Sequence, residues 1–483
     1  MPLILGTNSI KDTGFNVSNS LMFNSASADR MTSPTRGTAT SQKKGTFSWW
    51  QKKCKTGQQR MMGTYENGNN EFEIKLRSDD TMQFYQIAGG SNNLSYITNR
   101  VFRDPTAWMH IVFAIDTTQS SASDRVKIYI NGVQETSFST STNSMPQNHS
   151  FHGFYQGLTM SIGVNGQGDN ATPYDGYFAE WVYVDGLQLD PTSFGEFNSD
   201  SPTIWQPINV SGLTFGNNGF YLQFKESGTS QNSSGLGADT SGNDNHFAVT
   251  NLTAESQSTD SCTNNFATLS PLRYDIHTLA EGNLQYTAAT DAWKGVFSTI
   301  GVSTGKFYCE VKYSSLDGST WRFYTGIADA RDFNTVHKVG QNESGRVGDT
   351  IGILPHNTST DVIKNGSDAG GTWSNFSVND ILGMAIDCDN GALYFSRNGV
   401  WENSSNPESG ASKTGAITFT VGETYLFGFG TYGTSSPQQQ VNFGSPINSI
   451  SSGNSDANGY GNFEYAVPSG YYSLNSKNLA EFG

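Results

Sequence analysis

The chain has 483 residues, which is enough for two or three domains that each bury a core without disulfides. Charged residues make up 15% and aromatic residues 12%, and glycine occupies 53 positions, a composition that favours a turn-rich β protein and excludes a helical bundle or a disordered chain. The formal charge of −15 repels phosphate groups, so we expect no nucleic-acid partner and no binding to anionic membrane surfaces.

Apolar and polar residues alternate with period two in many short runs, separated by turns rich in Gly, Asn, Asp and Ser. Clear strands are predicted at residues 71–76, 125–130 and 306–311. Asn-Gly pairs at 131–132, 390–391 and 398–399 predict tight hairpin turns, because both residue types tolerate positive φ. The predicted fold class is all-β, with two antiparallel β-sandwich (jelly-roll) domains in tandem and a loop-rich connecting segment.

The patterning divides the chain into five segments. We expect an N-terminal attachment strand at 1–18, a first sandwich at 19–205, a loop-rich connecting segment at 206–289, a second sandwich at 290–448, and a linker with a C-terminal tail at 449–483. No stretch approaches the ~18 apolar residues of a membrane span, and the N-terminus lacks the basic residues of a secretory signal. The four cysteines form no C-x-x-C pair, which excludes a zinc site of the usual spacing.

Three segments of the first sandwich carry a family resemblance: Trp-Met-His-Ile-Val at 108–112, Val-Lys-Ile-Tyr-Ile-Asn-Gly-Val at 126–133, and Gly-Tyr-Phe-Ala-Glu-Trp-Val at 176–182. Their order is similar to that of the laminin-G/pentraxin group of concanavalin A-like jelly rolls. The resemblance implies that Trp108, Ile128, Ile130 and Trp181 fill the space between two sheets packed ~10 Å apart. Such modules often bind Ca²⁺ through loop oxygens, which implies Asp169, Asp175 and Asp185 as candidate calcium ligands.

The second sandwich carries a longer pattern. Gly-Lys-Phe-Tyr-Cys-Glu-Val at 305–311 precedes Asp-Cys-Asp-Asn-Gly-Ala-Leu-Tyr-Phe-Ser-Arg-Asn-Gly at 387–399, and Val-Asn-Phe-Gly at 441–444 closes it. This resembles the SPRY (B30.2-like) sandwich, although Cys309 stands where that family often has a ring. The family recognises ligands with loops at one end, which implies ligand-binding roles for Arg331, His337, His356, Asn357 and Trp373. In the glycine-rich loops of the first sandwich, Tyr155 and Tyr174 are the corresponding candidates. For each ring, packing beneath its own loop is the alternative.

Catalytic patterns are weak in this sequence. Laminarinase-type hydrolases share the concanavalin-like fold and carry E-x-D-x-x-E, whereas here Glu71 and Glu73 are followed by Leu76, which favours a solvated strand face. Asp387 and Asp389 flank a turn, and we expect them to cap its backbone amides. His149 and His152 lack a third metal ligand, and no G-x-S-x-G motif is present. We therefore expect no enzyme activity and no required cofactor, with Ca²⁺ as the one candidate ion.

The pairing of these two modules with a short tail at 468–474 resembles adhesin-type proteins of tailed bacteriophages, particularly marine ones. It implies a non-catalytic virion protein of a tail fibre, spike or appendage that binds a host-surface glycan or protein. We expect it to contact other virion proteins, to be multicopy or homo-oligomeric, and to act outside the host after assembly in its cytoplasm. The alternatives are a decoration or cement protein of the capsid or tail, and a divergent polysaccharide hydrolase.

Overall fold

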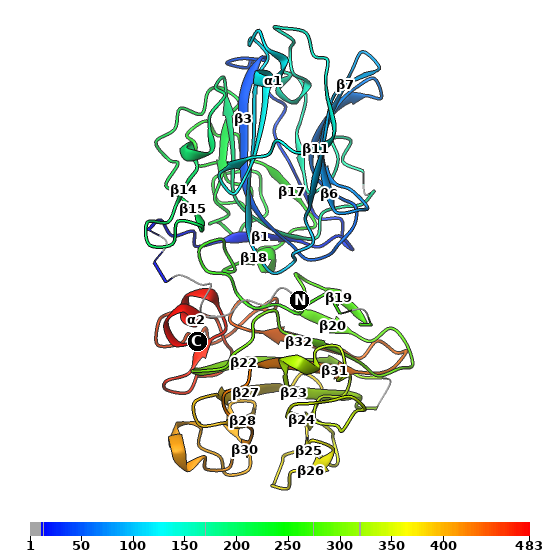
Figure 1. The fold of residues 1–483 in the computed structure, drawn as a ribbon, viewed down its shortest axis with the longest axis vertical. Helices are drawn as coiled ribbons and strands as arrows, with labels where there is room; N and C mark the ends of the chain where they lie inside the picture. Colours follow the sequence, from blue (N-terminus) through cyan, green and yellow to red (C-terminus); the bar gives the residue numbers. More distant parts are fainter. Residues whose placement is uncertain (1–10, 13, 170, 274, 318–319) are drawn as a thin grey trace. The chain divides into compact units, whose positions relative to one another are not determined.

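The computed structural model describes residues 11–12, 14–169, 171–273, 275–317 and 320–483. The chain forms two compact units, residues 14–263 and residues 264–483 with residues 11–12, and both consist mainly of antiparallel sheets (Figure 1). The predicted all-β class with two sandwiches is confirmed. The described helices are short, namely α1 (Ala122–Arg125), α2 (Ser476–Phe482) and single 3₁₀ turns.

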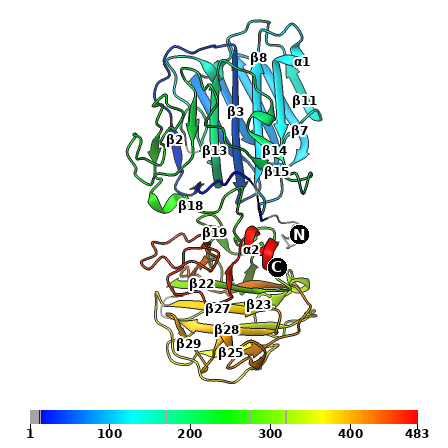
Figure 2. The ribbon, with the colours of Figure 1, turned by 90° about the vertical axis from the view of Figure 1, so that its left-hand side faces the viewer.

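The first unit is a sandwich of two large sheets, seen from a second side in Figure 2. One sheet has the order β10 (Val133–Gln134), β9 (Val126–Ile130), β8 (Met109–Asp116), β3 (Lys44–Lys53), β13 (Gly176–Asp185), β1 (Ser20–Phe23) and β18 (Gln257–Ser258), with β16 (Phe220–Leu222) also paired to β13. The other has the order β11 (Phe138–Asn143), β7 (Ser91–Val101), β6 (Thr81–Ala88), β5 (Asn70–Leu76), β4 (Gln59–Asn67), β12 (Ser161–Ile162), β2 (Arg30–Thr32) and β17 (Ala248–Thr250). A small ribbon of β14 (Gly195–Phe197) and β15 (Trp205–Pro207) accompanies them.

Aromatic and aliphatic side chains fill the space between these two sheets. Trp49 and Trp181 stack there with ring centroids 4.8 Å apart, and Ile128 and Ile130 belong to the same core, as expected. Trp108 differs from the expectation, because it is only partly buried outside this core and its Nε1 donates to Asp260 at 3.0 Å. Three of the four residues that the resemblance placed between the sheets are therefore confirmed.

The second unit is also a two-sheet sandwich. Its larger sheet has the order β19 (Thr278–Ala280), β20 (Gln285–Thr287), β32 (Gln438–Asn442), β22 (Lys306–Ser315), β27 (Ile381–Asp387), β28 (Ala392–Arg397) and β29 (Val400–Trp401), with β30 (Ile417–Thr418) beside β28 and β33 (Tyr472–Ser473) beside β22. Its smaller sheet has the order β21 (Lys294–Phe297), β31 (Tyr425–Thr431), β23 (Phe323–Asp329), β24 (Thr350–Leu354), β25 (Asp361–Lys364) and β26 (Ser367–Asp368). Cys309 is fully buried between them, as a small apolar residue would be.

Two of the three predicted hairpin turns have the expected geometry. Asn131–Gly132 and Asn398–Gly399 both have φ of 48° and 78°, so both residues lie in the left-handed region. At the third turn only Gly391 has positive φ, at 66°, since four residues separate β27 from β28. The Asp387 carboxylate accepts the backbone N–H of Asn390 at 3.0 Å, which confirms its predicted capping role. Asp389 instead accepts the backbone N–H of Gly305 at 2.8 Å, so its predicted role in the turn is wrong.

The expected connecting segment at 206–289 is divided between the two units at residues 263 and 264. Residues 220–222, 248–250 and 257–258 pair with strands of the first sandwich, whereas 278–287 pair within the second. The expected linker and tail at 449–483 pack on the second sandwich, where Phe463 and Tyr471 are buried and β33 runs parallel to β22. Most of the proposed attachment strand at 1–18 lies outside the described residues. No described helix is long and apolar enough to span a membrane.

Candidate binding sites

The residues predicted to bind ligand in the second sandwich do not form one site. Arg331, after the Asp329 end of β23, is paired by its own neighbours: Nη2 lies 2.6 Å from the Asp329 carboxylate and 3.2 Å from that of Glu423. His356 follows β24, and its Nδ1 accepts the Thr358 N–H at 3.1 Å, while the adjacent Asn357 is exposed. Strand β24 is antiparallel to β23, so these loop residues lie at the opposite end of β23 from Arg331.

Trp373 packs beneath its own loop, as the alternative reading held. Its Nε1 donates to the Gly370 carbonyl at 3.0 Å, and its ring meets Phe395 edge-on at 6.0 Å as part of the core boundary. The ring is therefore a packing element with one partly exposed face.

In the first sandwich Tyr155 is partly exposed, but Tyr174 is not a surface residue. Tyr174 has no exposed area, stacks on Phe178 with centroids 4.1 Å apart and has its pKa raised by burial. The prediction that Tyr174 contacts a ligand is wrong, because a ligand has no access to its buried ring. Its hydroxyl has no hydrogen-bond partner among the described residues.

The three candidate calcium ligands do not converge. Asp185 accepts backbone N–H groups of Thr40 and Ser41 at 2.7 and 3.1 Å, so its carboxylate organises a loop. Asp175 accepts the Ser25 hydroxyl at 2.5 Å, and Asp169 is half exposed and lies 3.6 Å from Arg60. No group of three or more His, Cys, Asp or Glu suited to a metal ion occurs within the part of the chain that the structure describes.

The Glu71–Glu73 pair lies on the outer face of β5, as its alternation predicts, but Glu73 is almost fully buried rather than solvated. The Tyr85 hydroxyl lies 3.0 Å from the Glu71 carboxylate and 2.5 Å from that of Glu73. Arg60 and Lys75 lie 3.2 and 3.8 Å from Glu73. Burial raises the pKa of Glu73 although these partners oppose the shift.

This arrangement argues against glycoside hydrolysis at β5. A retaining glycosidase holds two carboxyl groups ~5–5.5 Å apart with the glycosidic bond between them. Here the Tyr85 hydroxyl bonds to both carboxylates and takes the position that the scissile bond would need. The two carboxylates are joined through the Tyr85 hydroxyl on the sheet surface, and Glu73 Oε1 and Arg60 Nε have no hydrogen-bond partner among the described residues.

A Ser48, His110 and Glu180 grouping lines a narrow cavity in the first sandwich. Trp205 Nε1 donates to His110 Nδ1 at 2.9 Å, so the imidazole proton is on Nε2 and points at Ser48 Oγ, 2.8 Å away. His110 therefore cannot take a proton from Ser48, and burial lowers its pKa to about 3. The grouping is not a nucleophilic triad.

Glu180 occupies a bulge in β13, with φ of 49°, that turns its side chain into this cavity wall. The Tyr221 hydroxyl donates to its carboxylate. Burial raises the Glu180 pKa to about 7 despite this hydrogen bond.

A cluster of partly exposed rings lies on the outer face of the smaller sheet of the second sandwich. Trp293 meets Tyr324 edge-on with centroids 4.8 Å apart and lies 5.4 Å from Tyr432 at a 35° interplanar angle. The Arg322 guanidinium lies 5.1 Å from the Tyr432 ring centre. Its Nε has no hydrogen-bond partner among the described residues. We call Trp293, Tyr324, Tyr432 and Arg322 the aromatic surface.

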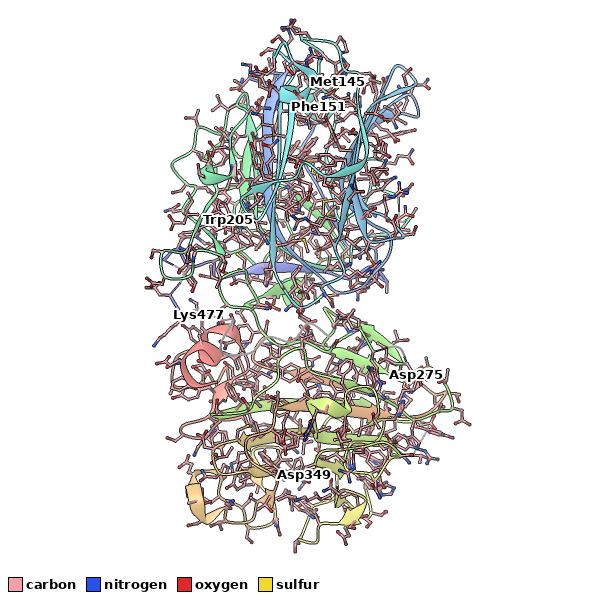
Figure 3. All side chains as sticks on the ribbon, viewed as in Figure 1. Met145, Phe151, Trp205, Asp275, Asp349 and Lys477 are labelled. Atoms are coloured by element: carbon pink, nitrogen blue, oxygen red, sulfur yellow. The ribbon has the colours of Figure 1, made fainter. Side chains whose placement is uncertain are left out.

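Polar side chains border the aromatic surface. Asp275, labelled in Figure 3, lies 2.6 Å from Lys294 and 3.7 Å from the predicted site residue His337. Lys294 holds the pKa of Asp275 below its usual value. Gln341 donates to the Tyr324 hydroxyl at 3.3 Å. The loop containing His337 therefore reaches the rings, although no motif in the sequence marks any of the three aromatic residues as a site residue.

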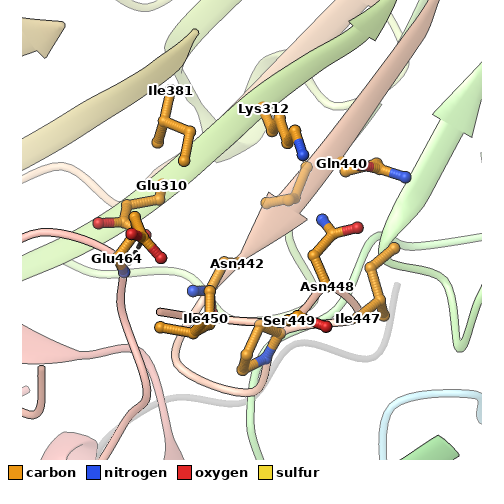
Figure 4. Close-up of a pocket in the computed structure, with 12 residues that line it drawn as sticks. Glu310, Lys312, Ile381, Gln440, Asn442, Ile447, Asn448, Ser449, Ile450 and Glu464 are labelled. Carbon is orange, nitrogen blue, oxygen red and sulfur yellow. Dashed lines mark hydrogen bonds between the residues drawn. The ribbon is translucent and has the colours of Figure 1, made fainter. Parts of the chain in front are cut away.

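A pocket of about 40 Å³ opens on the outer face of the larger sheet of the same sandwich (Figure 4). Ile381, Lys312 and Gln440 form one row across β27, β22 and β32, and Glu310 with Asn442 forms the next. The loop at residues 446–450 and Glu464 complete the wall. We call this the sheet pocket.

Comparison with known proteins identifies the fold of the first sandwich. Residues 25–187 match a family described as the concanavalin A-like lectin/glucanases superfamily, of laminin G type. No curated protein matches the chain.

Three solved structures are similar to the chain. The SPRY domain of human HERC1 is 12% identical over 36% of this chain and 96% of its own, with a TM-score of 0.27. Mouse laminin α1 domains LG4–5 are 7% identical over 87% and 84%, with a TM-score of 0.28. A putative carbohydrate binding protein from Bacteroides ovatus is 12% identical over 50% and 60%, with a TM-score of 0.32.

Proposed function

We propose that this chain is a non-catalytic glycan-binding protein whose second sandwich contacts the glycan through the aromatic surface. The observation that carries the proposal is the cluster of Trp293, Tyr324 and Tyr432 with the guanidinium of Arg322 beside it. Ring faces pack against the apolar C–H faces of sugars, and tyrosine and arginine add hydrogen bonds at the edge. The lectin-type family match of the first sandwich supports the same ligand class.

The unused donors of Arg322 strengthen the proposal. A guanidinium carries five N–H donors. The Nε of Arg322 is buried and has no partner among the described residues, so only the terminal N–H groups of this partly exposed side chain can reach a ligand. A sugar hydroxyl placed over Trp293 or Tyr432 would accept from those terminal groups. Arg331 by contrast already donates from Nε and Nη2 to Asp329 and pairs with Glu423, which leaves fewer donors for a ligand.

We further propose that the glycan belongs to a bacterial host and that the chain acts on a phage particle. The pairing of a laminin-G-like and a SPRY-like module supports this setting. Weak single contacts become useful there when many copies act together. In this proposal other virion proteins are the partners, the protein acts outside the cell, and binding requires no cofactor.

The test is inhibition of phage adsorption by the purified chain, together with an assay for new reducing ends on host polysaccharide. The proposal predicts inhibition and no reducing ends. New reducing ends would favour the hydrolase alternative. Inhibition that survives complete deglycosylation of the host surface would identify a protein receptor. If particle images show the aromatic surface buried against other virion subunits, the chain is a decoration or cement protein.

A further inference from the structure

The sheet pocket combines spare donors and acceptors with apolar walls. The Lys312 ammonium forms no ion pair or hydrogen bond within the described residues, and the Asn448 amide forms no hydrogen bond there. In Figure 4 Lys312, Gln440 and Asn448 gather on one side of the pocket, and Glu310 and Glu464 lie on the other. Ile381, Ile447 and Ile450 supply apolar walls.

The two carboxylates are held in fixed positions. Glu310 accepts the backbone N–H groups of Glu464 and Tyr465 at 2.9 and 2.8 Å and the Tyr308 hydroxyl at 3.1 Å. Glu464 in turn accepts the Ser451 N–H at 2.8 Å and the Ser451 hydroxyl. Glu310 Oε1 is filled by Tyr465 and Tyr308, whereas each oxygen of Glu464 accepts one hydrogen bond and keeps a further lone pair. Glu464 is therefore the main acceptor on a rigid wall.

We propose that the sheet pocket is a second sugar site, which binds one uncharged hexose unit. A hydroxyl both donates and accepts, so a polyol can give hydrogen bonds to Glu464 and receive them from Lys312 and Asn448. The isoleucine walls suit the C–H face of a pyranose. This inference rests on the proposed glycan-binding function, but at a different face of the same sandwich.

The charges of the pocket select against acidic sugars. Two carboxylates stand against one ammonium, on a chain with a net charge of −15. A carboxylated sugar would therefore meet repulsion from Glu310 and Glu464 that a neutral hexose does not. We therefore expect the sheet pocket to prefer neutral over acidic monosaccharides. The aromatic surface alone would not produce this preference.

The experiment titrates the intact chain with the methyl glycosides of glucose, galactose and mannose, and with glucuronate, by isothermal calorimetry or ligand-observed NMR. At least one neutral glycoside should bind saturably with a millimolar dissociation constant and at least tenfold more tightly than glucuronate. Asn448→Trp should fill the pocket and abolish this binding, and Lys312→Met should weaken it about tenfold. Lys364→Met, on β25 of the other sheet, is the matched control and should leave it unchanged.

Thermal unfolding verifies that each variant is folded. The inference is overturned if none of the three glycosides binds, if glucuronate binds as tightly, or if both pocket variants bind like the unmodified chain. Trp293→Ala separates the two proposals, because it should weaken binding of extended host glycans at least tenfold and leave monosaccharide binding in the pocket unchanged. If the unmodified chain binds extended glycans but no monosaccharide, the pocket inference fails and the proposed function stands.

Discussion

The outer faces of the two sandwiches use similar residue types in opposite ways. On β5 and β6 of the first, Glu71, Glu73 and Tyr85 are joined to one another and to Arg60 and Lys75. On the second, Trp293 and Tyr432 contact each other as partly exposed rings, and the Arg322 guanidinium lies 5.1 Å from the Tyr432 ring centre. Polar groups that pair with one another stabilise a surface, whereas partly exposed rings with a guanidinium beside them are available to a ligand.

The largest expected effect is on the stability of the first sandwich. Lys52 and Asp260 form a buried ion pair at 2.7 Å, with side chains 0% and 1% exposed. Asp260→Ala should lower the free energy of unfolding by about 3–5 kcal/mol, because a buried ammonium loses its carboxylate partner. Glycan binding by this variant should not change. Denaturant unfolding measures the stability and a binding assay on the same sample measures the affinity. Lys55→Ala, which breaks the exposed pair with Asp175, should cost less than about 1 kcal/mol. Equal losses of unfolding free energy in the two variants would contradict this distinction between a buried and an exposed ion pair.

A pH effect of roughly 3 kcal/mol is expected at Glu180. Its pKa is about 7 in the folded protein against a usual value of 4.5, so the folded state holds the proton more tightly. The contribution to stability is therefore fully present below pH 4.5 and is lost as the pH rises through 7. Glu180→Gln should remove this loss. In urea unfolding, the stability of the variant relative to the unmodified chain should therefore rise between pH 5 and pH 8. A constant difference between the two proteins across that range would show that Glu180 does not titrate there.

At the aromatic surface the effect should appear in binding and not in stability. Trp293→Ala should weaken glycan binding at least tenfold, about 1.4 kcal/mol, because the central ring of the cluster is removed. Trp373→Ala should leave glycan binding unchanged and lower stability. Its ring packs on Phe395, and the loss of its buried area costs about 1–3 kcal/mol of unfolding free energy. Calorimetry with host polysaccharide and thermal unfolding measure the two effects. If Trp373→Ala lost binding and Trp293→Ala did not, Trp373 would be the ligand contact and Trp293 the packing residue.

A smaller change is expected for Tyr85→Phe. The variant loses the hydroxyl that bonds to Glu71 and Glu73, which should cost about 1 kcal/mol of unfolding free energy. It should neither reduce glycan binding nor release sugar, as reducing-end assays will measure. Glycan hydrolysis by the unmodified protein that disappears in this variant would show that the β5 carboxylates are catalytic.

The smallest effect is expected from removal of calcium. Because Asp169, Asp175 and Asp185 bind separate partners, EDTA should change neither the unfolding midpoint nor glycan binding. A rise in the midpoint on adding millimolar Ca²⁺ back would show that a calcium site exists. Alanine variants of the three aspartates would then locate it.

The sequence predicts those features that depend on neighbours along the chain. Alternation in 71–76 and 306–311 gave correct strands, and the Asn-Gly pairs gave two correct turns, because φ preferences and strand periodicity are local. Burial was harder to predict. Trp108 and Trp181 both sit in strand-like patterns, but only Trp181 faces the opposite sheet.

The candidate sites depended on contacts between distant segments. Gly63 pairs with Glu73 across the sheet, and Gly166 packs so closely on Gly63 that a Cβ there would come within 2.6 Å of the Gly166 nitrogen. The aromatic surface combines residues that precede β21 or follow β31 with one on β23, and no local pattern marks them as neighbours. Only His337, in the predicted loop, pointed toward that part of the sandwich.

The central claim is that the glycan meets the second sandwich at its aromatic surface. A structure of the intact chain with a bound host oligosaccharide tests this most directly. The account predicts a sugar ring against Trp293 or Tyr432, with a hydroxyl in hydrogen-bond reach of Arg322. An oligosaccharide seated instead on the Glu71, Tyr85 and Glu73 face of the first sandwich would contradict it.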